Sequence, residues 1–443
     1  MKILFLSHYF PPEVNAPASR TYDHCVRWVK AGHEVTVVTC APNCPDGVVY
    51  PGYANRFRSQ REEMDGIRVI RVWTYVAPNA GTTRRILNYL SYMWSALWTA
   101  LWLPRPDVVI ATSPQFFCGW AGVLFHWLRR VPFVLEIRDI WPESIEAVGA
   151  MRNKPALAVL EMLERTMYRS ANHIITVGQG YKDNILSKVP LEGRISVITN
   201  GVDLNAFRPQ PRDESWLEKH GLRGKFVCSY IGTIGMAHGL EVIVKAARLL
   251  KEMGRRDVAF CLVGDGAARA ELQRQVDDAD LREWVVFTGR LPKSEVPTVL
   301  ASSDACLIHL RGCELFGTVM PSKIFETLAM GRTIIMGVRG EACDVVLDSG
   351  AGVEMEPDSP ESLVQIVETL SEEPEEAAER QKAAREYVAK HYNRDVLAGR
   401  FLGILDELVR PGSPRTGREC RTRSDDSGED SETEECVAEA ERS

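Results

Sequence analysis

Short runs rich in valine and isoleucine alternate with helix-length segments along most of this chain. Seven runs precede residue 200, and six more fall between residues 226 and 356. The runs are continuously apolar, as in "EVTVVTC" at 34–40, rather than alternately apolar and polar. Strands of this kind are buried on both faces, and strand–helix repetition builds parallel sheets. The pattern therefore predicts an α/β fold with two doubly wound parallel sheets.

The join between the two predicted domains falls near "TNGVDLNAFRPQPRDE", so we place them at residues 1–200 and 201–385. A chain of 443 residues is long enough for two separate hydrophobic cores. Residues 375–410 have the pattern of one or two amphipathic helices, and we place the C-terminal one at 386–410. Residues 411–443 are rich in serine and acidic residues and nearly free of aliphatic ones, so we predict that they are disordered.

The eleven cysteines include no C-x-x-C pair, and several lie in apolar, strand-like runs. This usage indicates reduced, buried thiols in a reducing compartment. The N-terminal apolar run is short and followed at once by prolines, unlike a signal peptide, so we expect a cytoplasmic protein. The D-x-D triplet at 278–280 lies in a polar segment and is interpreted as a solvated helix end. We therefore expect no metal site.

An uncharged run of 18 residues, "ILNYLSYMWSALWTALWL" at 86–103, is flanked by arginines. A membrane span needs roughly 20 residues, and this run also contains polar side chains. We expect a crossover helix, either buried against the sheet or lying on a membrane surface with its tryptophans on one face. Residues 1–200 carry a net charge of +6, which suggests an anionic partner such as a phospholipid surface or a pyrophosphate. Chance asymmetry is the alternative.

The loop after the first strand, "SHYFPPEVNAPASR", contains no glycine. A dinucleotide-binding fold needs G-x-G-x-x-G at this point, so the usual NAD or FAD enzymes are disfavoured. Glu13, Asn15 and Arg20 make the loop suitable for contacting a substrate. The alternative is a surface loop stiffened by its prolines.

The fifth apolar run ends in "EIRDIWPES", where Arg138 and Asp139 leave the strand beside a Trp-Pro pair. A carboxylate at a strand exit next to a flat apolar ring can hold a sugar hydroxyl. The alternative is that Asp139 caps the following turn. We favour the functional interpretation because Glu136, Arg138 and Asp139 are clustered.

In the second half, glycine-rich turns follow two consecutive strands. Gly232 lies in "YIGTIGMAHG", and Gly264 and Gly266 lie in "LVGDGAARAEL". Glycines let the backbone approach a ligand closely, and the amides of a following helix attract phosphate. Arg290, in "FTGRLPKSEV", leaves a third strand. The carboxyl ends of parallel strands share one edge, so we expect a nucleotide-binding edge there, although each turn could have only a structural role.

The segment "VMPSKIFETLAMG", residues 319–331, predicts a helix that begins at a proline and stops at a glycine. Free amides at its start attract phosphate, and Lys323 adds a mobile cation. Glu326 lies three residues further on the same face, where a carboxylate could accept hydrogen bonds from ribose hydroxyls. The alternative is an exposed ion pair between Lys323 and Glu326, worth only a few tenths of a kcal/mol.

Together these segments resemble the retaining, nucleotide-sugar-dependent glycosyltransferases of family 4, which have the GT-B fold. The resemblance covers about residues 1–410 and is carried by "ITNGVD", "VGDG", "FTGR" and "PSKIFETLAMGRTII". The segments "PPE", "RDIWPES" and "PSKIFE" are most similar to bacterial transferases that add N-acetylfucosamine-type or related amino sugars during O-antigen and capsule assembly.

The resemblance implies two facing Rossmann-like domains with a cleft between them. The first domain would bind the acceptor, the second would bind the nucleotide sugar, and the helix at 386–410 would cross back to the first domain. It also implies transfer with retention and without a metal or other cofactor. In this mechanism the leaving diphosphate assists the acceptor hydroxyl.

The expected site residues follow from these motifs. For catalysis they are Lys323, Asp139 and Glu326. For the nucleotide sugar they are Gly232, Thr233, His238, Gly264, Gly266, Arg290, Leu291, Ser322, Lys323 and Glu326. For the acceptor they are Glu13, Asn15, Arg20 and Arg138.

The chain departs from the family pattern at two points. A second glutamate is often found eight residues before the position of Glu326, where this chain has Thr318; Glu314 lies twelve before it. The usual arginine and lysine of the diphosphate loop align with Thr233 and His238. We hypothesise that Lys323 replaces the missing charge.

The expected reaction is transfer of a sugar, an N-acetylated amino or deoxyamino sugar, from a UDP-sugar to a lipid-linked saccharide on polyprenyl pyrophosphate. The enzyme would be cytoplasmic and peripheral to the inner face of the cell membrane, with an anionic membrane surface but no nucleic acid as a partner. One alternative is a UDP-sugar epimerase with His8 or His309 as the base. The other is a non-enzymatic assembly protein bound to the membrane through residues 86–103.

Overall fold

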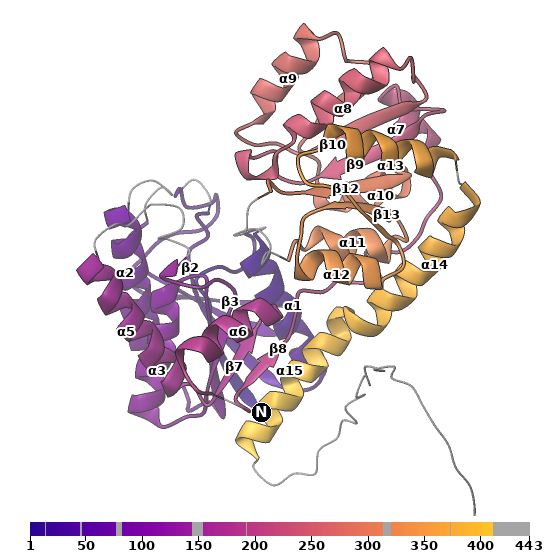
Figure 1. Ribbon diagram of the computed structural model, residues 1–443. Coiled ribbons are helices and arrows are strands. Elements are labelled where there is room, and N and C mark those ends of the chain that lie inside the picture. Colours follow the sequence, from indigo (N-terminus) through magenta and orange to yellow (C-terminus); the bar gives the residue numbers. More distant parts are fainter. Residues whose placement is uncertain are drawn as a thin grey trace, which may run out of the picture.

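The computed structural model contains two α/β domains with one parallel-type sheet each (Figure 1). The residues described are 1–13, 15–44, 47–76, 82–143, 154–191, 193–312, 320–372 and 374–410. The predicted disordered segment at 411–443 lies outside them. Within them, no helix is both long and apolar enough to cross a membrane. Seven cysteines are free thiols, and all seven are buried: Cys25, Cys40, Cys118, Cys228, Cys261, Cys306 and Cys343.

The first domain is built on an eight-stranded sheet. Its strand order is β3 (Gln60–Met64), β4 (Ile67–Val72), β2 (Glu34–Cys40), β1 (Lys2–Leu6), β5 (Val108–Thr112), β6 (Phe133–Ile137), β7 (His173–Thr176) and β8 (Ile195–Val197). All neighbours pair in parallel except β3, which is antiparallel to β4. The sequence pattern missed β3 because this edge strand, "QREEM", is polar and partly exposed.

Helices cover both faces of this sheet, which explains why its strands are continuously apolar. One face carries α2 (Thr82–Leu101), α3 (Phe116–Arg129) and α5 (Lys154–Ser170), and the other carries α1 (Ala16–Lys30) and α15 (Arg394–Val409). Along β1, Leu4 and Leu6 join the core beneath α2 and α3, whereas Ile3 and Phe5 join the core beneath α1 and α15. Helix α6 (Gln179–Lys188) follows β7.

The second domain is built on a six-stranded, fully parallel sheet. Its strand order is β11 (Val285–Gly289), β10 (Val258–Val263), β9 (Phe226–Ile231), β12 (Ala305–His309), β13 (Thr333–Gly337) and β14 (Gly352–Glu354). These are the six strands that the apolar runs predict.

The helices of the second domain lie between and after its strands. The α-helices are α7 (Glu214–Lys219), α8 (Glu241–Glu252), α9 (Arg269–Asp278), α10 (Val296–Ala301), α11 (Lys323–Ala329), α12 (Glu341–Asp348), α13 (Pro360–Glu372) and α14 (Pro374–His391). Two short 3-10 turns are η1 (Met236–His238) and η2 (Lys293–Glu295). Asp278, the first residue of the D-x-D triplet, is the last residue of α9, at the helix end that the sequence predicts.

The chain crosses between the domains twice, and the two crossings are hydrogen bonded to each other. The amide of Val202 donates to the carbonyl of Tyr392 at 2.9 Å, and the amide of Arg394 donates back to the carbonyl of Val202 at 3.1 Å. A short parallel bridge pairs Val202 with Asn393. The two connections therefore form one hydrogen-bonded, two-chain linker between the domains.

Residues 375–410, predicted to form one or two amphipathic helices, form two, and the C-terminal helix placed at 386–410 begins at Arg394. Helix α14 runs to His391 and packs against α11 in the second domain, so the expected boundary at residue 385 falls inside it. Helix α15 packs against α1 in the first domain. The break falls where the Asn393 side chain accepts a hydrogen bond from the Asp395 amide and caps α15. The amphipathic pattern continues through this break, so the pattern alone does not show where the first helix ends.

Candidate active site

A cavity of about 390 Å³ opens at the carboxyl ends of β9, β10 and β11 in the second domain. Its lining includes five of the residues predicted to bind the nucleotide sugar: Gly232, Thr233, Gly264, Arg290 and Leu291. They come from three separate strand exits and meet because parallel strands end at the same edge. This shared edge makes the cavity the candidate nucleotide pocket.

The glycines of this pocket allow two loops to pack against each other. Gly232 and Gly264 have φ angles of 147° and 143°, which residues with a side chain rarely adopt. A Cβ atom on Gly264 would lie 1.9 Å from the carbonyl oxygen of Gly232, and one on Gly266 would lie 2.4 Å from that of Ile234. Close approach of the loops thus explains these glycines even without a ligand. Gly266 does not line the cavity; it supports the loop that does.

Lys323 extends from the start of α11 toward the nucleotide pocket. Its Nζ lies 4.1 Å from the centroid of the Tyr230 ring, a cation–π contact. A Cβ atom on Gly232 would lie 2.9 Å from the same Nζ, so the ammonium rests against the pocket loop. Burial lowers the pKa of Lys323 to about 8, although the nearby Glu326 carboxylate opposes the shift. The side chain is still mainly protonated at neutral pH.

His238 lies beside this cation. Its ring meets the Tyr230 ring edge-on, and its buried Nδ1 has no hydrogen-bond partner among the described residues. Burial, and then the charge of Lys323, lower the pKa of His238. His238 is therefore neutral at neutral pH, which leaves Lys323 as the cation at this point.

Glu326 lies one turn further along α11 and lines a different cavity. This second cavity, of about 270 Å³, lies between the domains and also includes Ser322, Lys293 from η2 and Arg394 from α15. Burial raises the pKa of Glu326, with Lys293 the largest opposing influence. No described residue donates a hydrogen bond to the Glu326 carboxylate. It is a half-buried acceptor that lines an open cavity, as a group that binds a hydroxyl would be.

The alternative interpretation of Lys323 and Glu326, a mutual surface ion pair, is wrong. Lys323 contacts the Tyr230 ring, and Glu326 lines the interdomain cavity. Helix α11 also begins at Lys323, with Ser322 at its N-cap, two residues later than the proline in the sequence suggests. The Lys323 ammonium thus lies beside the loop of the nucleotide pocket, whereas Glu326 lines the interdomain cavity.

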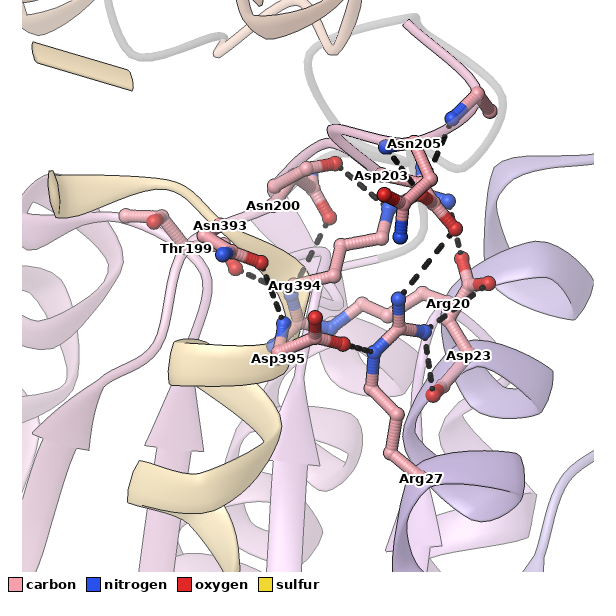
Figure 2. Close-up of polar contacts among 12 residues, drawn as sticks. Arg20, Asp23, Arg27, Thr199, Asn200, Asp203, Asn205, Asn393, Arg394 and Asp395 are labelled. Carbon is pink, nitrogen blue, oxygen red and sulfur yellow. Dashed lines mark hydrogen bonds and ion pairs between the residues drawn. The ribbon is translucent and has the colours of Figure 1, made fainter. Parts of the chain in front are cut away.

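An ion-pair network borders the interdomain cavity (Figure 2). Arg394 binds the Asp23 carboxylate at 2.7 Å and the Gly201 carbonyl at 2.9 Å. On α1, Arg27 pairs with Asp203 of the first crossing and Asp395 of α15. The network joins α1, the crossing and the start of α15. Sequence reasoning missed Asp23 and Arg394 because they are 371 positions apart in the chain.

Two of the four predicted acceptor contacts serve the fold instead. The Glu13 carboxylate is buried and accepts hydrogen bonds from the amides of Phe10, Asn43 and Cys44. The Asn15 side chain caps α1 by accepting from the amide of Ala18 at 2.8 Å. Both predictions are wrong, because the side-chain oxygens that would have contacted a substrate accept hydrogen bonds from backbone amides instead.

Arg20 and Arg138 converge on one buried carboxylate, Glu136. Arg20 donates to Glu136 at 2.9 Å and also to the carbonyls of Ile198 and Thr199. Burial would raise the pKa of Glu136, but Arg20 and then Arg138 lower it to about 2. Arg20 therefore ties α1 to β6 and the first crossing while it borders the interdomain cavity.

Arg138 differs from Arg20 because it retains free donors. Burial lowers its pKa to about 10, and its Nε and Nη1 atoms have no hydrogen-bond partner among the described residues. A buried guanidinium with unused donors is the feature of the first domain most suited to binding an anionic or hydroxyl-bearing acceptor.

Asp139 lines a narrow hollow in the first domain, together with Trp141 and Phe116. The Trp141 ring stacks on that of Phe116, with centroids 6.0 Å apart. The hollow does not include Lys323 or Glu326. The structure thus does not place the three predicted catalytic residues in one cavity, because Asp139 lies in the first domain, away from the cavity that Glu326 lines.

The two histidines proposed as epimerase bases are engaged in the fold. His8 is buried, its Nδ1 lies 2.6 Å from the Gln115 amide nitrogen, and burial lowers its pKa to about 3. His309 places Nδ1 2.7 Å from the His238 carbonyl and accepts from the Asp358 amide at Nε2. Neither ring has a nitrogen directed at a substrate cavity. The predicted departures at Glu314 and Thr318 lie outside the described residues.

Comparison with known proteins identifies both domains. Residues 15–201 match the family "Glycosyl transferase 4-like domain", and residues 213–387 match "Glycosyl transferases group 1". The chain belongs to the GT-B glycosyltransferases. The glycosyltransferase is 25% identical over 422 residues to WcaI of Escherichia coli (strain K12), a protein named for colanic acid biosynthesis; the match covers 91% of this chain and 100% of WcaI.

Two further proteins are similar to this glycosyltransferase. One is the GDP-mannose-dependent alpha-mannosyltransferase of Mycolicibacterium smegmatis, 26% identical, with 92% of this chain and 96% of the relative covered. The other is Anabaena HepE, whose structure in complex with UDP superposes with a TM-score of 0.66 at 17% identity, covering 92% of this chain and 100% of HepE. The structural likeness confirms the predicted fold of two parallel-sheet domains.

Proposed function

We propose that this glycosyltransferase moves a sugar with retention from a UDP-sugar to a lipid-linked glycan, at the cytoplasmic face of the membrane, during synthesis of a cell-surface polysaccharide. The position of α11 is the observation that best supports binding of a nucleotide-sugar donor. It places the Lys323 ammonium against the glycine loop of the nucleotide pocket and the unbonded Glu326 carboxylate in the interdomain cavity. The relation to WcaI supports the polysaccharide part.

In this proposal Lys323 stabilises the departing diphosphate. The ammonium is partly desolvated, so its attraction for phosphate oxygens is stronger than in water. Glu326 would accept hydrogen bonds from the ribose hydroxyls, which also offsets the cost of its burial. Arg290 and Leu291 at the rim would contact the base and phosphate. No metal is required, because Lys323 supplies positive charge where the family's usual basic residues are absent.

Arg138 and Asp139 would position the acceptor from the first domain. Both follow β6, at the edge of the sheet that also carries the loop after β1. The unused guanidinium donors of Arg138 suit a pyrophosphate or a sugar hydroxyl. The sugar is proposed to be an N-acetylated amino or deoxyamino sugar, on the resemblance of the "RDIWPES" and "PSKIFE" segments.

A donor screen with a membrane-lipid acceptor extract tests the proposal. Purified enzyme is incubated with UDP-sugars and with GDP-mannose, since HepE binds UDP and the mycobacterial relative uses GDP-mannose. We expect release of UDP only when the acceptor is present, with unchanged turnover in excess EDTA. Epimer formation without acceptor would establish the epimerase, and release of GDP alone would overturn the choice of donor. Loss of all turnover in EDTA would overturn metal independence.

A further inference from the structure

One face of α2 carries large apolar side chains that the fold leaves uncovered. Leu87, Trp94, Trp98 and Trp102 are 50%, 60%, 66% and 75% exposed. Their spacings of seven, four and four residues place the first three in one stripe along α2, and Trp102 directly follows the end of the helix. The opposite side of α2, including Tyr92 and Ala96, is buried in the core of the first domain. The tryptophans are therefore not needed for packing against the sheet.

The stripe continues onto α3. Arg129 donates to the Leu101 carbonyl at 2.6 Å, and Arg105 donates to the Arg130 carbonyl at 3.1 Å, so the C-terminal ends of α2 and α3 lie together. At this end Trp127 and Leu128 are 50% and 62% exposed. Figure 1 shows α2 and α3 on the same outer side of the first domain. We call these six exposed side chains, which lie along α2 and at the neighbouring ends of α2 and α3, the tryptophan face.

The charge around the tryptophan face is strongly positive. Residues 82–130, which span α2, α3 and the strand between them, contain five arginines and a single acidic residue, Asp107, in a chain whose total charge is −7. Arg84 and Arg85 are exposed at the start of α2, and Arg105 and Arg130 are exposed at its far end. Tryptophan favours the boundary between lipid headgroups and acyl chains, and arginine favours anionic headgroups. A second copy of the chain would instead present the same positive charge and be repelled.

We propose that the tryptophan face binds the surface of an anionic lipid bilayer, with α2 lying in the plane of the interface. The reason for such binding rests on the proposed function, because an enzyme that uses a lipid-linked acceptor must reach that acceptor at a membrane. The N-terminal part of α2 is close to the acceptor side: the Tyr89 ring lies 6.2 Å from that of Trp141, which borders the hollow of Asp139. A bilayer against α2 would therefore hold a lipid-linked acceptor near the domain that carries Arg138 and Asp139.

Vesicle sedimentation tests the surface. The full chain is mixed with vesicles of phosphatidylcholine alone or with phosphatidylglycerol added. We expect binding to the anionic vesicles to exceed binding to the neutral ones by at least about tenfold, since each basic residue near the surface adds about 1 kcal/mol. The triple variant Trp94→Ser, Trp98→Ser, Trp102→Ser should lose at least about tenfold in binding. The variant Arg84→Gln, Arg130→Gln should bind more weakly and show a smaller salt dependence.

The matched control changes two exposed apolar side chains of the second domain, Met253→Ser and Leu347→Ser, and should bind vesicles like the wild type. Equal binding by the triple variant and the wild type would overturn the proposal. The proposal would also be overturned if sedimentation velocity showed that the wild type is a dimer and the triple variant is a monomer. UDP binding is measured on every variant to confirm folding. Vesicle binding without any nucleotide-sugar turnover would refute the proposed function and leave the membrane surface standing.

Discussion

The carboxylate of Glu341, the first residue of α12 in the second domain, accepts hydrogen bonds from the backbone amide of Gln179, the first residue of α6 in the first domain, at 3.1 Å to each oxygen. The amide of Gly180 adds a third, at 3.4 Å. The start of a helix has free amides and a partial positive charge, so a carboxylate satisfies both. The second domain thus caps a helix of the first domain, at the edge of the first sheet where β7 ends.

We expect Glu341→Gln to loosen this contact. A carboxylate at a helix start is worth about 0.3–1 kcal/mol, so the amides of Gln179 and Gly180 should exchange hydrogen about two- to fivefold faster. Hydrogen exchange measured by mass spectrometry on the peptide that contains them provides the test. Glu361→Gln is the control, because Glu361 also lies in the first turn of a helix but contacts only Ser359 of its own domain. Equal exchange in the two variants would contradict the contact.

The affinity for UDP should fall as pH rises through about 8. Lys323 carries its charge below its lowered pKa of about 8 and loses it above, and a bound diphosphate favours the charged form. Affinity should therefore decrease by up to about tenfold per pH unit above 8. Calorimetry between neutral pH and mildly basic pH measures it.

Two variants separate Lys323 from other groups. Lys323→Gln should bind UDP about 10–100-fold more weakly at neutral pH and show no dependence on pH near 8. Lys323→Arg, which stays charged throughout this range, should also be independent of pH but bind more tightly than the glutamine variant. If the glutamine variant kept the wild-type pH profile, Lys323 would not be the group that titrates.

Glu326 should discriminate between UDP and its 2′-deoxy or 3′-deoxy analogues. A hydrogen bond from a hydroxyl to a carboxylate is worth about 1.5–3 kcal/mol, so the wild type should prefer UDP over at least one analogue by about 10–100-fold. Glu326→Ala should remove most of that preference. A double-mutant cycle of dissociation constants measures the coupling. Glu295→Ala, an exposed glutamate of η2, should retain the preference. A preference that survives in Glu326→Ala would assign the ribose contact to another residue.

Gly264→Ala should damage the nucleotide pocket. Its Cβ would lie 1.9 Å from the Gly232 carbonyl oxygen at a φ of 143°, so the two loops must separate. We expect a loss of roughly 1–3 kcal/mol in stability and weaker UDP binding. Gly399→Ala in α15 is the contrasting variant, because its Cβ meets nothing within 4 Å and should stabilise the helix by about 0.5–1 kcal/mol. Thermal unfolding and UDP titration of both variants provide the measurement.

Arg20→Leu should destabilise the first domain by about 3–5 kcal/mol, because it leaves the buried Glu136 with one fewer cation. Adding Glu136→Gln should restore part of that loss. The folded pKa of Glu136, about 2, is below its ordinary value of 4.5, so its contribution is full above pH 4.5 and is lost as pH falls toward 2. Acid unfolding of the wild type and the double variant tests whether the ion pair loses its contribution to stability as the pH falls. An Arg20→Leu enzyme of wild-type stability but impaired acceptor KM would restore the predicted acceptor role.

Local patterns in the sequence predicted the two sheets, and they predicted which strand exits share one edge of the second sheet. The apolar runs marked thirteen strands, because strands buried on both faces need continuous apolar residues. The pattern could not mark β3, whose polar residues lie at the sheet edge. Gly232, Gly264 and Arg290 were also predicted together, since each follows a strand and parallel strands end at one edge.

Contacts between distant parts of the chain decided the rest. Glu13 and Asn15 had the residue types and the loop of a substrate site, but only the folded chain shows that backbone amides engage them. Asp23, Lys293 and Arg394 had no shared motif, yet they line one cavity because the chain crosses between the domains twice. The sequence by itself determined the strand pattern and the chemistry at each strand exit, because both depend on near neighbours. The tertiary structure decided which exits face one another, because that depends on how two separately formed cores pack.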